Sequence, residues 1–143
     1  MRLSSSGFKL LVSFESVAYK AYKDNKGYSI GIGHYILPNE KYLLTKTLSH
    51  AEVLLLFQKD SQAFQKELNT LLDKWKIKVN QKQYDSLFSC YYNMGMGKFQ
   101  ASGILQALQA MNKEKIEEAF MKMDKGLDAI KLRRSAELSY FWS

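Results

Sequence analysis

A single stretch of this chain has the residue pattern of a β-hairpin, while the segments that follow it have helical periodicity. Positions 19–35 are rich in Tyr and Ile, and Asp24-Asn25-Lys26-Gly27 in their middle has the composition of a tight turn. Gly27 can adopt the positive φ that such a turn requires. A third short strand fits positions 35–37. One hairpin followed by several helices predicts an α+β fold whose strands are confined to the N-terminal part of the chain.

Helices are predicted on both sides of the hairpin. Ser4–Ser6 can cap a short first helix, and Ser49-His50-Ala51-Glu52 forms a capping box at the start of a long one. Asn80-Gln81-Lys82-Gln83 predicts the cap of a second helix, which Asn93–Gly97 end. Further helices fit positions 103–111, 113–123 and 127–141. Apolar residues recur along the long helix at helical spacing: Val53, Phe57, Phe64, Leu68, Leu71 and Trp75.

The composition excludes several classes of protein. A chain of 143 residues can bury its own core, and its one cysteine, Cys90, excludes a disulfide-stapled miniprotein. No apolar run reaches the ~18 residues of a membrane span, and no signal-peptide pattern opens the sequence, so we expect no stable membrane insertion. The two histidines, His34 and His50, form no ligand cluster with the cysteine, and we therefore expect neither a metal nor a cofactor.

The formal net charge of +7 favours an anionic partner, such as nucleic acid, lipid head groups or bacterial cell wall. A solvated surface that carries more basic than acidic residues also accounts for this net charge. The chain has no block of five or more like charges and no nucleic-acid recognition motif. A nucleic-acid-binding protein that stacks bases on its tyrosines is therefore only a weak alternative, and we expect no nucleic-acid partner.

Two carboxylates beside the hairpin are the first candidates for catalysis. Glu15 is expected near the C-terminal end of the first helix, where unsatisfied carbonyls and apolar neighbours such as Phe14 favour the protonated acid. Asp24 lies in a polar turn and is expected to stay ionised. Two carboxyl groups held in different protonation states are typical of glycoside hydrolysis. Each residue taken alone also fits an ordinary solvated glutamate or a turn-forming aspartate.

Three more polar residues have positions that suggest a role. Ser29 follows Asp24 by five residues, and its hydroxyl could orient a water held by that carboxylate, or it is an ordinary strand serine. No G-x-S-x-G motif supports a serine nucleophile. Asp60 falls on the apolar stripe of the long helix, where a charge needs a partner, and His34 is the expected counter-charge. Ile30-Gly31-Ile32-Gly33 indicates close backbone approach or a cleft wall, not a dinucleotide loop.

Read together, these residues resemble the phage-type lysozyme family, including the T-even phage lysozyme and endolysin muramidases. The family pattern places an Asp nine positions after a Glu and then a strand that ends in Ile-Gly-Ile-Gly-His, as Glu15, Asp24 and Ile30–His34 do here. Ser29 stands where the family has Thr, and only Tyr28 separates it from Gly27. Similar segments follow at Leu56–Asp60, Val79–Leu87, Tyr92–Gly95 and Arg133-Arg134 with Glu137.

The resemblance implies a lysozyme-like α+β fold within a single domain at positions 1–143. A small N-terminal hairpin lobe would span about 14–48, and a long linking helix about 49–74. A larger helical lobe would span about 75–143 and include the first helix. From spacing alone, Arg133 and Arg134 are expected to pair with Glu137 on the surface of the last helix.

The resemblance also implies a muramidase that hydrolyses the β-1,4 bond between N-acetylmuramic acid and N-acetylglucosamine with inversion. Glu15 would protonate the leaving oxygen, Asp24 would activate water, and Ser29 would help to hold that water. The remaining implied roles are substrate contacts by Gly33 and Asn93, a structural ion pair of His34 with Asp60, and a pairing of Glu15 with Arg133 or Arg134.

The implied partner is peptidoglycan, bound by a monomer. The protein would be made in the bacterial host cytoplasm and act in the periplasm or cell wall after release or delivery, for host lysis. A non-catalytic peptidoglycan-binding module of the same fold is the alternative, and a tail or toxin domain in place of a free endolysin also fits the sequence.

Overall fold

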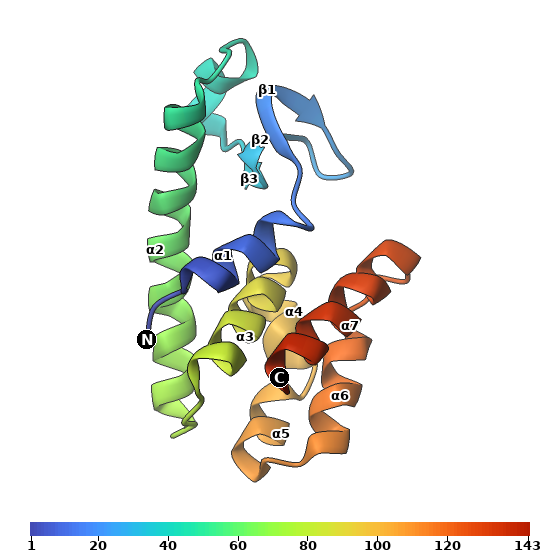
Figure 1. Cartoon of the computed structure of the whole chain (residues 1–143). Coiled ribbons are helices and arrows are strands. Elements are labelled where there is room, and N and C mark those ends of the chain that lie inside the picture. Colours follow the sequence, from blue (N-terminus) through green and yellow to red (C-terminus); the bar gives the residue numbers. More distant parts are fainter. The chain divides into compact units, whose positions relative to one another are not determined.

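The computed structural model describes residues 1–143 and is mostly helical, with one three-stranded sheet (Figure 1). The predicted α+β class is confirmed. The chain divides into two compact units, one of residues 11–63 and one of residues 1–10 with 64–143. The elements in chain order are α1 (Ser5–Val12), β1 (Val17–Lys23), β2 (Tyr28–Ile32), β3 (His34–Tyr35), the 3₁₀-helix η1 (Pro38–Leu44), α2 (His50–Lys74), α3 (Gln81–Met94), α4 (Met96–Ala101), α5 (Ile104–Ala110), α6 (Lys113–Lys122) and α7 (Asp128–Phe141).

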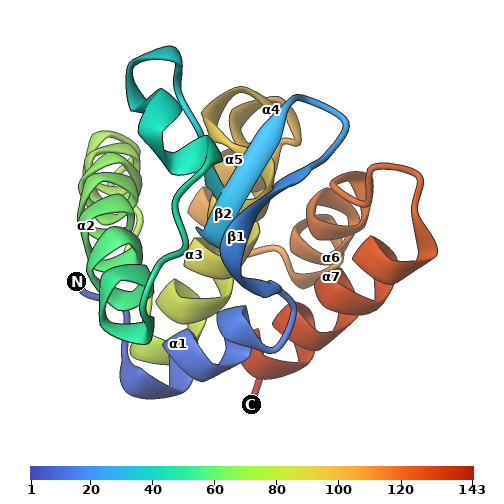
Figure 2. The ribbon, with the colours of Figure 1, turned by 90° about the horizontal axis from the view of Figure 1, so that it is seen from above.

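The unit of residues 11–63 contains the antiparallel sheet in the order β1-β2-β3. Figure 2 shows β1 and β2 side by side, and their register places Tyr22 opposite Ser29 and Lys23 opposite Tyr28. The turn Asp24–Gly27 closes with a hydrogen bond of 2.8 Å from the Asp24 N–H to the Gly27 carbonyl. The predicted hairpin is therefore confirmed. The third strand begins one residue earlier than predicted, and it is short because the chain enters η1 soon afterwards.

The first half of α2 covers β2 within this unit. A Cβ on Gly31, whose φ is +67°, would lie 3.5 Å from Leu56 Cδ2 and 3.9 Å from Val53 Cγ1, so the strand backbone packs directly on the helix. Ile30 and Ile32 are buried beside it. The predicted capping box is present: the Ser49 N–H donates to Glu52 Oε1 at 3.0 Å, and the Glu52 N–H donates to Ser49 Oγ at 3.1 Å.

The second unit is helical. α6 and α7 lie side by side in both views, and α3 packs against α7 (Figures 1 and 2). The predicted cap of α3 is confirmed, because the Asn80 side chain accepts a hydrogen bond from the Gln83 N–H at 2.9 Å. The predicted break after Asn93 is also present. Helix α4 was not predicted: Gly95 adopts a φ of +83°, and a new helix begins at the next residue.

A buried aspartate joins the N-terminal segment to α3. Asp85 is fully buried and accepts hydrogen bonds from the Ser4 N–H at 3.0 Å and from the Ser4 hydroxyl at 2.5 Å. Gln81 Nε2 and the Tyr140 hydroxyl donate to the same carboxylate at 2.9 and 3.3 Å. The Gly7 N–H donates to Ser4 Oγ at 3.0 Å, which confirms a serine cap for α1. A Cβ on Gly7 would lie 2.4 Å from Asp85 Cγ, so only glycine fits there.

Candidate active site

Glu15 follows the end of α1 and precedes β1, as its sequence position predicts. The N–H groups of Phe14 and Glu15 both donate to the Leu11 carbonyl at 3.1 Å, which completes the last turn of the helix. The glutamate is partly exposed. The hydrogen bond to Leu11 therefore fixes the backbone of Glu15 at the end of the helix, and the partial exposure leaves its side chain accessible to a ligand.

Asp24 is held by its own turn. The N–H groups of Lys26 and Gly27 donate to Oδ1 at 2.8 and 3.1 Å, and the Ser29 hydroxyl donates to Oδ2 at 2.7 Å. The Ser29 hydrogen bond and then the backbone hydrogen bonds hold the pKa of the Asp24 carboxyl below its ordinary value. Asp24 is therefore ionised at neutral pH, which is the state that a general base requires.

Ser29 is almost completely buried, with 4% of its surface exposed, although Asp24 beside it is exposed. A serine hydroxyl has one hydrogen and two lone pairs, and here the hydrogen is given to Asp24. Toward a water molecule Ser29 can therefore act only as an acceptor. The loop with a single residue between Gly27 and Ser29 still brings this hydroxyl onto the carboxylate.

Tyr22 is a site residue that the sequence analysis missed. Burial raises the pKa of its phenol, the charges of Glu15 and Asp24 raise it further, and hydrogen bonding with Ser29 lowers it. The sequence could have indicated Tyr22, because the turn Asp24–Gly27 sets the register of the hairpin. That register places Tyr22 opposite Ser29 on the same face.

His34 contacts two carboxylates. Its Nδ1 lies 2.7 Å from Asp60 Oδ2 on α2, and its Nε2 lies 3.0 Å from Glu40 Oε1 in η1. The hydrogen bond with Asp60 raises the pKa of the imidazole, burial opposes this, and Glu40 adds to the rise. The Glu40 contact was not predicted. Since His34 pairs with Ile30 across β2 and β3, the ion pairs join the sheet, η1 and α2.

We expect Asp60→Asn to lower the free energy of unfolding at about pH 6 by roughly 1–3 kcal/mol, because His34 loses a charged hydrogen-bond partner. A raised histidine pKa stabilises the fold fully below the unfolded-state pKa of about 6.5, and this contribution is lost as the pH rises through the folded-state value. The wild-type thermal midpoint should therefore fall from about pH 6 to about pH 9, and that of Asp60→Asn should fall less. The exposed Asp73→Asn on the same helix is the control, and an identical pH dependence in all three proteins would contradict the expectation.

The C-terminal signature is buried, so the expectation that its ion pairs lie on the surface is wrong. Arg133, Arg134 and Glu137 are each at most 2% exposed. Arg133 Nε donates to Glu137 Oε2 at 3.2 Å, and Arg134 Nη1 donates to Glu137 Oε1. Ser89 Oγ donates to Glu137 Oε2 at 2.5 Å, and the main-chain carbonyl of Ser89 accepts a hydrogen bond from Arg133 Nη2 at 3.0 Å. Polar partners on α3 make burial possible, and sequence spacing does not reveal them.

Asn93 belongs to this buried network. Its side-chain oxygen accepts a hydrogen bond from Arg134 Nη2, and Arg134 Nε donates to the Met123 carbonyl at 3.0 Å. The amide is therefore oriented by a guanidinium group. The substrate contacts of Asn93 and Gly33, and the pairing of Glu15 with Arg133 or Arg134, stay predictions. Gly33 is partly exposed with a φ of +68°.

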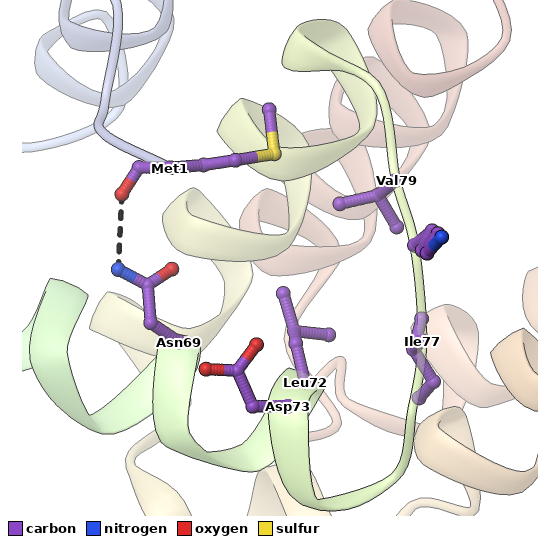
Figure 3. Close-up of a pocket in the computed structure, with 7 residues that line it drawn as sticks. Met1, Asn69, Leu72, Asp73, Ile77 and Val79 are labelled. Atoms are coloured by element: carbon purple, nitrogen blue, oxygen red, sulfur yellow. Dashed lines mark hydrogen bonds between the residues drawn. The ribbon is translucent and has the colours of Figure 1, made fainter.

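A hollow lies within the helical unit. It has a volume of about 460 Å³ and is lined by Met1, Asn69, Leu72, Asp73, Ile77, Lys78 and Val79. Figure 3 labels all of these residues except Lys78. Asn69 Nδ2 donates to the Met1 carbonyl at 2.9 Å across its edge. Asp73 is the only carboxylate among the residues that line it.

The structure has no group of three His, Cys, Asp or Glu side chains that could hold a metal ion. No helix combines the length and apolarity that crossing a bilayer requires.

Comparisons with known proteins show which family the chain belongs to. The family model described as phage lysozyme matches residues 12–137. The endolysin of Salmonella phage P22 is 30% identical over 148 residues, which cover 100% of this chain and 99% of that protein. The endolysin of Bacillus phage B103 is 36% identical over 128 residues, or 87% of this chain and 46% of the relative, so this chain spans less than half of that protein's length. The solved endolysin from Escherichia coli O157:H7 phage FAHEc1 has a TM-score of 0.83 and 26% identity over 99% of this chain and 93% of its own. From these matches we conclude that the chain belongs to the phage lysozyme family.

Proposed function

We propose that this chain is a muramidase that hydrolyses the β-1,4 bond between N-acetylmuramic acid and N-acetylglucosamine in peptidoglycan. The observation that supports it most is the hairpin: Asp24 is exposed and is held ionised by hydrogen bonds from the Ser29 hydroxyl and two backbone N–H groups, and the partly exposed Glu15 directly precedes the same hairpin. The endolysin names of the relatives agree with this activity.

In the proposed mechanism Glu15 is the general acid that protonates the leaving glycosidic oxygen. Asp24 is the general base that takes a proton from the attacking water. Ser29 accepts a hydrogen bond from that water, because its own hydrogen is already given to Asp24. Attack by a water on the face opposite the leaving group inverts the anomeric carbon. Every step uses side chains of this chain and water alone.

We further propose that the protein acts as a monomer on the cell wall of a bacterial host, after synthesis in the host cytoplasm and release or delivery to the periplasm or wall. The net charge of +7 supports attraction to a wall rich in anionic polymers. The relatives named endolysins support a role in host lysis.

Digestion of purified peptidoglycan, followed by mass spectrometry of the borohydride-reduced products, tests the activity. We expect every new reducing end to be N-acetylmuramic acid. N-acetylglucosamine at the new ends would show that the other glycosidic bond is cut and would contradict the bond assignment. Proton NMR of the first product formed tests the stereochemistry, because inversion gives the α-anomer initially.

The alternative binding module predicts a different pair of results. A non-catalytic module would sediment with insoluble peptidoglycan and release no reducing sugar at any pH. The retained Glu15, Asp24 and Ser29 argue against it, because a binding module has no need of an oriented, ionised aspartate. Binding without release would overturn the proposed hydrolase.

A further inference from the structure

The end of α2, the start of α3 and the connection between them carry a cluster of positive charge. Residues 74–84 contain no acidic residue and four exposed lysines, which we call the α2–α3 lysines: Lys74, Lys76, Lys78 and Lys82. None of them takes part in an ion pair of the structure. Of the two flanking acids, Asp85 is buried and only Asp73 is exposed. The lysine charges are therefore compensated by little within the chain.

The local structure turns these lysines to solvent. Helix α2 ends in a Schellman cap, in which the Lys76 N–H donates to the Asp73 carbonyl at 3.0 Å. The Ile77 N–H donates to the Leu72 carbonyl at 2.9 Å, and the Ile77 side chain is buried. Lys76 and Lys78 on either side of it are exposed. Two residues span at most about 7 Å, so these two charged residues stand less than one Debye length apart at physiological salt.

The stability of the fold does not account for this placement. Lys76 has a φ of +53°, a conformation in which glycine is favoured at the end of a helix. Lys82 lies in the first turn of α3, where the helix dipole disfavours a cation and no acidic residue offsets it. Only Lys74, in the last turn of α2, has a charge that the dipole favours. At least two of the four lysines thus stand where another residue would stabilise the chain better.

The composition of this surface fits a hydrophilic polyanion. Lysine ammonium groups bind phosphate as point charges. No large apolar side chain between residues 56 and 95 is exposed, so the surface has no apolar face to place in a lipid bilayer. Trp75, the one aromatic residue among the lysines, is only partly exposed, which leaves nucleic-acid bases little on which to stack.

Resting on the proposed function, we propose that the α2–α3 lysines form a binding surface for the phosphodiester polymers attached to peptidoglycan. The surface belongs to the helical unit, whereas Asp24 and Ser29 belong to the unit of residues 11–63. Its role is to hold the protein on the wall, and it takes no part in the cleavage of the glycosidic bond. Because the contacts are between exposed charges, binding weakens as salt screens them.

The test measures sedimentation with cell walls that carry phosphodiester polymers, in the Glu15→Gln background so that the walls are not digested. At low ionic strength we expect Lys78→Gln with Lys82→Gln to raise the dissociation constant about 25-fold, roughly fivefold for each lysine beside an anionic surface. The slope of its logarithm against the logarithm of salt concentration should become shallower by about two. The matched control is Lys115→Gln with Lys131→Gln, which removes the same charge from exposed positions on α6 and α7 and should bind as the parent does.

Lys76→Gly separates binding from folding. Glycine is favoured at this position, so we expect a thermal midpoint at or above that of the parent. The dissociation constant for the walls should nevertheless rise about fivefold, because one charge of the surface is lost. An unchanged dissociation constant in this variant and in the double variant would overturn the proposal.

The same walls after removal of the polymers with hydrofluoric acid identify the ligand. There we expect the lysine substitutions to have no effect, whereas equal losses on both kinds of wall would overturn the proposal by showing that the carboxylates of peptidoglycan itself are bound. Tighter binding of duplex DNA, or of vesicles that contain phosphatidylglycerol, than of the walls at the same salt concentration would overturn it as well. A wild type that releases no sugar would contradict the proposed function, whereas the losses of wall binding would still support the surface.

Discussion

Glu15→Gln is expected to lower the rate of peptidoglycan hydrolysis by about 10²–10⁴-fold, the usual contribution of a general acid. Glutamine has nearly the shape of glutamic acid but cannot transfer a proton to the leaving oxygen. Because the backbone of Glu15 is fixed by hydrogen bonding to Leu11, we expect the substitution to leave the fold intact. The rate of reducing-sugar release from purified peptidoglycan measures the loss.

The matched control is Glu118→Gln on α6, which makes the same chemical change at an exposed position. It should retain full activity. Thermal midpoints of both variants close to that of the wild type would show that the loss is chemical and not a loss of folded protein. Full activity in a folded Glu15→Gln variant would remove the general-acid assignment.

Glu137→Gln is expected to lower the free energy of unfolding by about 3–5 kcal/mol, which is the cost of breaking a buried ion pair from one side. The carboxylate is the shared partner of two buried guanidinium groups and of the Ser89 hydroxyl. Burial raises the pKa of the Glu137 carboxyl, and the two arginines oppose the rise. A neutral amide leaves both cations buried without a counter-charge, so the loss should exceed that of one neutral hydrogen bond.

Urea unfolding followed by circular dichroism measures this difference, with Glu118→Gln again as the control because its carboxylate is exposed. Surface substitutions usually change stability by no more than about 0.5 kcal/mol. A Glu137→Gln variant as stable as the control would contradict the assignment of this carboxylate as the counter-charge of the arginines.

Local signals made most of the fold predictable. The turn Asp24–Gly27 and the boxes at Ser49 and Asn80 depend on residues within a few positions of one another, and the structure confirms all three. Helix α4 and η1 were missed because both are short and have too few residues to show a hydrophobic period.

The candidate site was only partly predictable for a different reason. Asp24 and Ser29 meet across one turn, so their spacing was informative. Glu40 reaches His34 through η1, an element that the sequence pattern did not reveal. The burial of Arg133 depends on Ser89, which is 44 residues away, and no local pattern encodes that contact.

The carboxylate of Asp85 also constrains the order in which the chain can complete its structure during translation. Its partners Ser4, Gln81 and Tyr140 are spread over almost the entire sequence. Asp85, which accepts the hydrogen bonds of Ser4 at the start of the amino-terminal helix, can acquire its full set of donors only after residue 140 has been synthesised. A nascent chain that ends before this residue therefore lacks the Tyr140 hydrogen bond to the buried carboxylate.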